Sequence, residues 1–407
     1  MKHDFTKTLA NGLKFTYIYS PTELTSIGLG VKAGVRHALD DTWNPGLTSH
    51  IMQEVAQQNI AIGAPMKMIG AHDRESIRMS CFVPNAHSAS CLDALASSLA
   101  PTEGMIDAAI PGARHAATVE AQALLHPQAL RQSSTLHAML GPAVGRIDPL
   151  MTQWEPQTAE ATLAQFHEHV RPDVSSVVVI GGADPNQLMA KLESLDFGSA
   201  PVNADSPLHV PPVGTVLTAR IGEPTFTLSW RAGGLGSGDY IPLSVLFRAL
   251  GSCQRFAAGG PGKGLLAVLP LMGLPAGMVE TGAAYHPLSD MGVFEISGQL
   301  AQSTGSDDEK LQSAMQAGAA FLGQLGGALT SVPGLFRRAV NQSKSNMLLA
   351  LEDIAVHLRE AVTHSMTADG IYSAPDLAAQ LDGLTEEQWS DTVVRMLKGK
   401  PMVMLTV

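Results

Sequence analysis

The two halves of the chain end in the same order of residue patterns, which indicates that one structural unit occurs twice. Residues 158–170 have the spacing of a capped amphipathic helix, Pro172 interrupts it, and the apolar run 176–180 is typical of a buried strand. Residues 385–397 and 402–407 repeat this order of helix, break and strand at the C-terminal end. A duplicated unit restricts the fold to two domains of similar architecture.

The two halves also begin alike. Residues 26–33 and 225–232 alternate apolar and polar side chains, and each predicted strand is followed by a glycine, a polar loop and an apolar helix. We therefore expect an α+β fold with two homologous domains, in each of which helices pack on an antiparallel-rich sheet. The chain has 407 residues, of which 45% are hydrophobic and 15% charged, so it contains enough apolar material for two cores.

A stretch without helical or strand periodicity separates the two predicted domains. It covers residues 197–214 and contains four prolines, which is typical of a linker. We expect an N-terminal domain at residues 1–196 and a C-terminal domain at residues 215–407.

Composition argues against several classes of protein. The formal net charge of -11 disfavours a nucleic-acid-binding surface. The three cysteines are too few and too scattered for a disulfide framework or a thiolate zinc site, which fits a reducing compartment. We find no apolar run of the roughly 18 residues that a transmembrane helix needs. Residues 1–8 have the features of neither a signal peptide nor an arginine-rich presequence.

The first predicted strand, at residues 26–33, leads through a polar loop into a helix that resembles the zinc helix of pitrilysin-type metallopeptidases. That family carries the inverted motif H-x-x-E-H, in which two histidines bind zinc and the glutamate is the general base. Here His50 stands in the first histidine position, Gln53 in the position of the base and Glu54 in that of the second histidine. Glu120 falls at the distant third-ligand position.

Two interpretations of this helix remain open. Either His50 and the nearby carboxylates keep a metal site with Glu120 as the distant ligand, or the motif has decayed. An amide such as that of Gln53 cannot take a proton from water at neutral pH. The sequence also lacks a G-x-S-x-G elbow and the context of a cysteine nucleophile. We therefore expect no bound metal, no cofactor and no peptide-bond cleavage by this chain alone.

A glycine-rich segment after the apolar helix of the second half is the most specific motif in the chain. It consists of Gly259, Gly260, Pro261, Gly262, Lys263 and Gly264. Such a segment suits a mobile loop whose backbone approaches another chain, or a structural turn. A phosphate-binding loop would follow a strand and would have serine or threonine after Gly-Lys, which this segment does not.

The glycine-rich segment resembles the loop of the alpha subunits of mitochondrial processing peptidase, a family that includes the second core subunit of respiratory complex III in some lineages. Further matches occur in the same order along the chain. They lie at residues 9–13, 281–292, 338–352 and 396–401. The resemblance therefore spans nearly the whole chain.

The resemblance implies a heterodimer with a zinc-bearing beta-type subunit, in the mitochondrial matrix, on the matrix face of the inner membrane, or in a related organelle. The glycine-rich segment would handle incoming presequences. Glu352 and Glu360 would receive presequence arginines through charge-assisted pairs. Arg255 and Lys263 depart from the family pattern, because they add positive charge where a cationic substrate must pass.

Two other roles fit the same fold and the same degenerate motif. One is a core scaffold subunit of complex III (cytochrome bc1), alone or combined with presequence processing. The other is the inactive half of a bacterial two-chain peptidase. The glycine-rich segment favours the organellar roles over the bacterial one.

Overall fold

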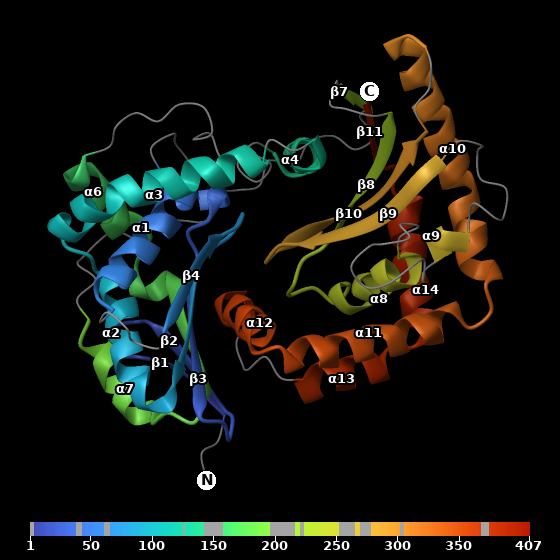
Figure 1. Ribbon diagram of the computed structural model, residues 1–407. Helices are drawn as coiled ribbons and strands as arrows, with labels where there is room; N and C mark the ends of the chain where they lie inside the picture. The colour runs from blue at the N-terminus through green and yellow to red at the C-terminus, as the bar shows by residue number, and fades with distance from the viewer. Residues whose placement is uncertain are drawn as a thin grey trace. The chain divides into compact units, whose positions relative to one another are not determined.

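The computed structural model describes eleven stretches of the chain, which form two compact units (Figure 1). These stretches are residues 4–37, 43–60, 66–124, 127–141, 158–195, 216–219, 224–251, 265–268, 278–301, 305–367 and 374–407. Unit 1 consists of Met1–His126, Pro142–Leu208 and Ala350–Ser373. Unit 2 consists of Pro127–Gly141, His209–Leu349 and Ala374–Val407.

Unit 1 is built on a six-stranded sheet with the strand order β1-β2-β6-β3-β5-β4. Its strands are β1 (Phe5–Thr8), β2 (Lys14–Tyr19), β3 (Leu24–Val31), β4 (Lys67–His72), β5 (Ile77–Pro84) and β6 (Ser175–Gly181). Strands β2 and β6 pair in parallel, and the other neighbours pair antiparallel. Strand β4 therefore lies at one edge of the sheet.

Helices cover both faces of this sheet. The main core of unit 1 lies between the sheet and helices of the first half of the chain. These are α1 (Pro45–Gln58), α2 (Ser88–Leu99), α3 (Glu103–Leu124), α6 (Ala159–His169) and α7 (Pro185–Glu193). On the other face, α12 (Ile354–Thr367) packs Leu358 and Val362 against Ile18, Val178 and Ile180.

Unit 2 is built on a five-stranded sheet with the order β7-β11-β8-β10-β9. Its strands are β7 (Val216–Ala219), β8 (Thr225–Gly233), β9 (Met278–Pro287), β10 (Met291–Leu300) and β11 (Met402–Thr406). Strands β7 and β11 pair in parallel, and the other neighbours pair antiparallel.

The core of unit 2 lies between this sheet and helices of the second half of the chain. These are α8 (Tyr240–Leu250), α9 (Leu265–Val268), α10 (Asp307–Ser331), α11 (Leu335–Glu352), α13 (Ala374–Gly383) and α14 (Glu386–Lys398). Helix α4 (Pro127–Leu140) lies against β8 on the sheet face that carries Met404 and His286. Within the described ranges, no helix is long and apolar enough to span a membrane.

The strand orders confirm the predicted α+β fold class. The order β2-β6-β3-β5-β4 of unit 1 corresponds to β7-β11-β8-β10-β9 of unit 2, including the single parallel pair at the same position. The predicted strands 26–33 and 225–232 correspond to β3 and β8, and the predicted helices at the ends of the two halves correspond to α6 and α14. The sequence repeat is thus a structural repeat.

The two units nevertheless differ from the expected consecutive division of the chain. Residues 127–141, which include α4, belong to unit 2, and residues 350–373, which include α12, belong to unit 1. The division into residues 1–196 and 215–407 is therefore wrong for these two segments. The periodicity of a helix indicates which of its faces is apolar, but not which sheet that face will cover. The expected linker at residues 197–214 lies outside the described residues.

Candidate functional site

The degenerate zinc motif lies on α1 of unit 1, which packs against both α3 and the edge strand β4. Helix α1 begins at Pro45 because the side-chain oxygen of Asn44 accepts a hydrogen bond from the backbone N–H of Leu47 at 3.0 Å. Positions 50 and 54 are one turn apart, so their side chains leave the same side of the helix. The helix predicted to carry the motif is thus present.

His50 and Glu120 are brought together, as the family pattern implies for these two positions. His50 Nε2 lies 2.8 Å from Glu120 Oε2, and this contact joins α1 to α3. The hydrogen bond with His50 is the main cause that lowers the pKa of the Glu120 carboxyl, while its partial burial opposes the shift. Glu120 is therefore an ionised acceptor at neutral pH.

His72 on β4 is a third member of this cluster that the sequence analysis missed. Its Nδ1 lies 4.0 Å from Glu120 Oε2 and 3.5 Å from the hydroxyl oxygen of Ser49. Its positive form also contributes to the lowered pKa of Glu120. The available signal was its position at the end of a short strand, which does not reveal that this strand borders α1.

The side chain of Gln53, in the position of the general base, forms a hydrogen bond with the edge strand β4. Its Oε1 accepts a hydrogen bond from the backbone N–H of Gly70 at 3.0 Å. A Cβ atom on Gly70 would lie 2.9 Å from this oxygen and 3.0 Å from the backbone oxygen of Ser49, so β4 and α1 approach each other closely here. The amide of Gln53 thus connects α1 to β4, and its oxygen already accepts a hydrogen bond from the strand.

Glu54, in the position of the second zinc-binding histidine, faces another part of α3. A Cβ atom at Gly112 would lie 3.1 Å from its carboxyl carbon. Gly112 and Glu120 are eight residues apart, a rise of about 12 Å along a helix. The carboxylate of Glu54 and the pair formed by His50 and Glu120 are therefore directed at different places.

These positions do not fit a zinc ion. A zinc site needs its nitrogen and oxygen ligands within about 2.2 Å of one point. Within the part of the chain that the structure describes, no group of three or more histidine, cysteine, aspartate or glutamate side chains is placed to hold a metal ion. The arrangement instead holds α1, α3 and β4 together through polar contacts.

Among the described residues, Glu352 and Glu360 form no hydrogen bond or ion pair with this cluster. Glu352 is exposed at the C-terminal end of α11. Glu360 on α12 accepts hydrogen bonds from the guanidinium of its neighbour Arg359 at 2.9 and 3.1 Å. The glycine-rich segment, Gly259 to Gly264, lies outside the described residues, as does Arg255.

Several solved structures share this architecture. A chain of complex III2 from Candida albicans matches with a TM-score of 0.78 and 14% identity, over 99% of this chain and 95% of that chain. The inactive M16 peptidase domain from Pseudomonas fluorescens matches with a TM-score of 0.74 and 13% identity, over 100% of this chain and 98% of that chain. This chain has the M16 peptidase fold. Because the identities are so low, the likeness establishes the fold alone.

The M16 fold does not by itself decide whether a chain cleaves peptides. A protease from Helicobacter pylori also matches, with a TM-score of 0.74 and 14% identity over 100% of both chains. The catalytic capacity of an M16-fold chain must therefore be judged from the residues on its zinc helix.

Sequence similarity points to one group of proteins with this fold. The chain is 32% identical over 165 residues to a probable mitochondrial-processing peptidase subunit alpha of Schizosaccharomyces pombe. The match covers 40% of this chain and 31% of that relative, so it spans less than a third of the relative's length. No family model matches the chain. The resemblance to processing-peptidase alpha subunits that the motifs indicated is thus confirmed over this stretch.

Proposed function

We propose that this chain is the non-catalytic, substrate-binding alpha subunit of a mitochondrial-type processing peptidase, which removes presequences together with a zinc-bearing beta-type subunit. The observation that carries the proposal is the residue type at position 53 and the hydrogen bond that it makes. An amide stands where the general base would be, and its oxygen accepts the backbone N–H of Gly70. The sequence similarity to an alpha subunit supports the choice among M16-fold chains.

The chemistry of the site supports a role without bond cleavage. A general base must accept a proton from the attacking water, and a neutral amide does not do so. A zinc ion would supply the activated water in an active relative, but here the second histidine position holds a carboxylate, that of Glu54, which lies beside Gly112. We therefore assign the cleavage step to the partner subunit.

In this proposal the chain contributes substrate binding. Gly259 to Gly264 form the loop that handles the presequence, and Glu352 and Glu360 pair with its arginines. Glu352 is exposed, whereas Glu360 would have to exchange Arg359 for the substrate. We place the complex in the mitochondrion or a related organelle, because the named relative is a mitochondrial-processing subunit.

Reconstitution with a beta-type partner that carries H-x-x-E-H tests this proposal. Replacing Gly259, Gly260, Gly262 and Gly264 by alanine stiffens the segment without shortening it. We expect cleavage of a presequence peptide to fall about tenfold, equivalent to about 1.4 kcal/mol. The control replaces Gly323, Gly326 and Gly327 on α10, where added methyl groups would meet nothing within 4 Å. Unchanged presequence binding and cleavage in the loop variant would reject the proposal.

A core scaffold subunit of complex III is the second candidate. The specific observation in its favour is the TM-score of 0.78 with a chain of complex III2, over nearly the full length of both chains. Native gel electrophoresis of the purified complex distinguishes the two. Co-migration with cytochrome subunits supports the scaffold role, and a heterodimer without haem proteins supports the peptidase role. A dimer with a bacterial-type active M16 chain would instead support a two-chain bacterial peptidase.

A further inference from the structure

Glu295, in the middle of strand β10 of unit 2, is a buried carboxylate whose two oxygens are incompletely paired. Only 7% of its surface is exposed. Its one ion pair among the described residues is with His286 on β9, whose Nε2 lies 3.4 Å from Oε2. Its other oxygen, Oε1, is buried and has no hydrogen-bond partner in the described part of the chain. A buried acceptor without a partner costs free energy and calls for an explanation.

A second polar atom without a partner lies at the neighbouring position of the sheet. Ser229 on β8 is directly opposite Glu295 in the antiparallel register, so the two side chains leave the same face. Ser229 is fully buried, and its hydroxyl oxygen makes no hydrogen bond within the described ranges. A hydroxyl oxygen can accept a hydrogen bond, as a carboxylate oxygen can. Two acceptors are thus available at adjacent positions.

The corresponding position of unit 1 carries the opposite charge and is paired on two sides. In unit 1, Gly30 on β3 and Arg78 on β5 hold the places of these two residues in the structural repeat. The guanidinium of Arg78 forms an ion pair with Asp73 at 2.9 Å and donates a hydrogen bond to Thr363 on α12 at 3.1 Å. Unit 1 therefore satisfies the charged group at this position from within the chain. Unit 2 has a carboxylate there, and the described residues supply only His286.

Small residues leave this face of the sheet accessible on one side of Glu295. Its neighbour on the edge strand β9 is Ala284, and the next pair on the same face is Ser297 and Gly282. Ser297 is exposed, and Ala284 and Gly282 are half-buried. A Cβ atom at Gly282 would meet only Ser297 Oγ, at 4.0 Å. The carboxylate can therefore be approached across these three residues.

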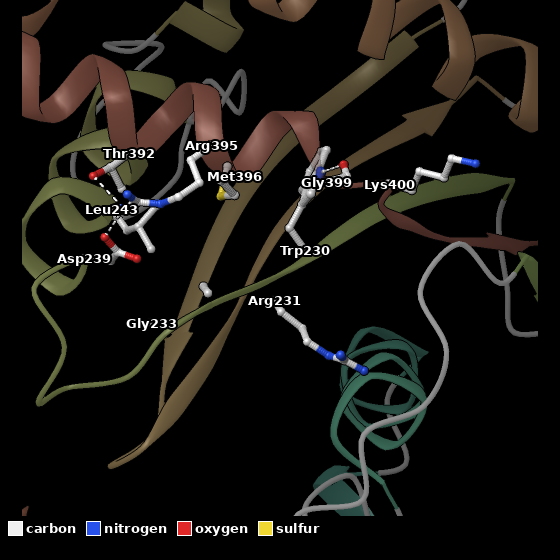
Figure 2. A pocket seen from close by; sticks show the side chains of 11 residues that line it. Trp230, Arg231, Gly233, Asp239, Leu243, Thr392, Arg395, Met396, Gly399 and Lys400 are labelled. Atoms are coloured by element: carbon white, nitrogen blue, oxygen red, sulfur yellow. Dashed lines mark hydrogen bonds and ion pairs between the residues drawn. The ribbon is translucent and has the colours of Figure 1, made fainter.

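Helix α4 lies on the other side of Glu295. Gln132 on α4 has its side-chain nitrogen 3.2 and 3.3 Å from the two ring nitrogens of His286. Arg231, two residues beyond Ser229 on β8, also points from this face toward α4 (Figure 2). The strip of small residues thus ends at Glu295, next to the helix.

The chemistry of this place suits the end of a long basic side chain. Carboxylate and hydroxyl oxygens are acceptors, and a guanidinium or ammonium group supplies only donors. Lysine and arginine carry this group at the end of a slender aliphatic stem, which fits over small residues such as Ala284 and Gly282. A metal ion does not fit, because the described residues bring no third histidine, cysteine, aspartate or glutamate to this place.

We infer that Glu295 binds the cationic group of a lysine or arginine side chain, which belongs to a peptide that lies across this face of unit 2. Glu295 Oε1 accepts a charge-assisted hydrogen bond, and the hydroxyl of Ser229 accepts a second one. The aliphatic stem of the bound side chain packs on Ala284 and Gly282. The site uses none of the residues assigned to presequence handling, so the inference does not depend on the proposed function.

The test compares two blocked pentapeptides on the full chain. One has arginine at its centre between serine and glycine residues, and the other has citrulline, which has nearly the same shape but no charge. Binding is followed by the NMR line broadening of the peptide, which detects weak complexes. We expect arginine to bind at least about tenfold more tightly, because an unpaired buried carboxylate is costly. Equal affinity, or no binding of either peptide, would overturn the inference and leave water as the partner of Oε1.

Two matched substitutions separate this site from the general negative charge of the chain. Glu295→Gln keeps the shape of the side chain but removes its charge, so it should abolish the preference for arginine. Glu387→Gln removes the same charge from an exposed position on α14 and should leave the preference unchanged. Thermal unfolding checks that both variants are folded. A preference for arginine that survives Glu295→Gln would reject Glu295 as the binding residue.

A third variant keeps the inference testable if Glu295→Gln does not fold. Ser297 is exposed two residues along β10 on the same face, so Ser297→Arg supplies a guanidinium from the chain itself. We expect this variant to lose the preference for arginine and to unfold at a higher temperature. Ser313→Arg, at an exposed position of α10, should do neither. Unchanged peptide binding by Ser297→Arg would contradict the inference.

Discussion

At the residue scale, small chemical differences separate this zinc helix from one that can hold metal. Glutamine in place of glutamate removes a proton acceptor, and glutamate in place of histidine replaces an imidazole by a carboxylate. The structure adds a reason why the change at position 53 is stable. The amide of Gln53 satisfies the backbone N–H of Gly70 on an edge strand, where a donor without a partner invites unwanted pairing.

Substitutions that restore single residues of the H-x-x-E-H motif should distinguish the effect of a zinc ligand from that of the general base. Glu54→His places a second imidazole one turn from His50, on the same side of α1. We expect this variant to bind about one zinc ion per chain, measured by metal analysis after dialysis. Gln53→Glu is the matched control, because it restores the base but adds no ligand. Zinc bound equally by both variants, or by neither, would contradict this account of the motif.

Single residues were also where sequence analysis was least complete. His50, Gln53, Glu54 and Glu120 could be placed on the motif because they have fixed spacing on helices. His72 could not, because it enters through the long-range pairing of a short edge strand. The contact between Gln53 and Gly70 likewise depends on how α1 lies across the sheet, which no local pattern encodes.

At the element scale, α12 is held on the sheet of unit 1 by close packing against glycines of β3. A Cβ atom at Gly28 would lie 2.5 Å from Val362 Cγ2, which is too short for any ordinary contact. We expect Gly28→Ala to destabilise the chain by about 1–3 kcal/mol in urea unfolding. Gly104→Ala is the control, because a side chain there would meet nothing within 4 Å.

A second substitution checks that α12 is the cause. Val362→Ala removes the methyl group that Gly28→Ala would meet, so the double variant should lose less stability than the sum of the two single variants. Additive effects would show that the strand, and not the packing of α12, responds to the substitution.

The same helix should make unit 1 sensitive to acid. Burial lowers the pKa of His357 and of His364 on α12; Asp4 partly opposes this at His357, and Lys14 adds to it at His364. Their folded-state pKa values lie below the ordinary value of about 6.5, so the unfolded chain binds protons first as the pH falls. Stability should therefore be full above about pH 6.5 and decrease below it.

Urea unfolding at pH 7.5 and pH 5.5 measures this effect. The variant with His357→Gln and His364→Gln should lose less stability between the two pH values than the unaltered chain. His115→Gln serves as the control, because His115 is exposed on α3. A double variant with the same pH dependence as the unaltered chain would assign the acid sensitivity to other groups.

At the scale of the whole molecule, the two halves of the sequence exchange one helix each. Helix α4 of the first half belongs to unit 2, and α12 of the second half belongs to unit 1. Residues 1–196 expressed alone would lack the cover over Ile18, Val178 and Ile180. We expect each half alone to be unstable to proteolysis, and the two halves expressed together to form a resistant complex. A resistant, monomeric N-terminal half would contradict this expectation.

The repeat itself was predictable, because local residue patterns in each half indicate strands and helices in the same order. The α+β class and the ends of α6, α14, β3 and β8 followed from that pattern to within about two residues. The helix exchange did not follow, because an amphipathic helix can cover either of two similar sheets.

The most direct measurement of the central claim is presequence cleavage by the purified chain, alone and with a zinc-bearing beta-type partner, each with and without a chelator. We predict that the chain alone does not cleave, that the mixture does, and that the chelator abolishes the cleavage. Replacing the H-x-x-E-H glutamate of the partner should abolish cleavage as well. Chelator-sensitive cleavage by this chain alone would contradict the claim that Gln53 and Glu54 leave it without a catalytic zinc site.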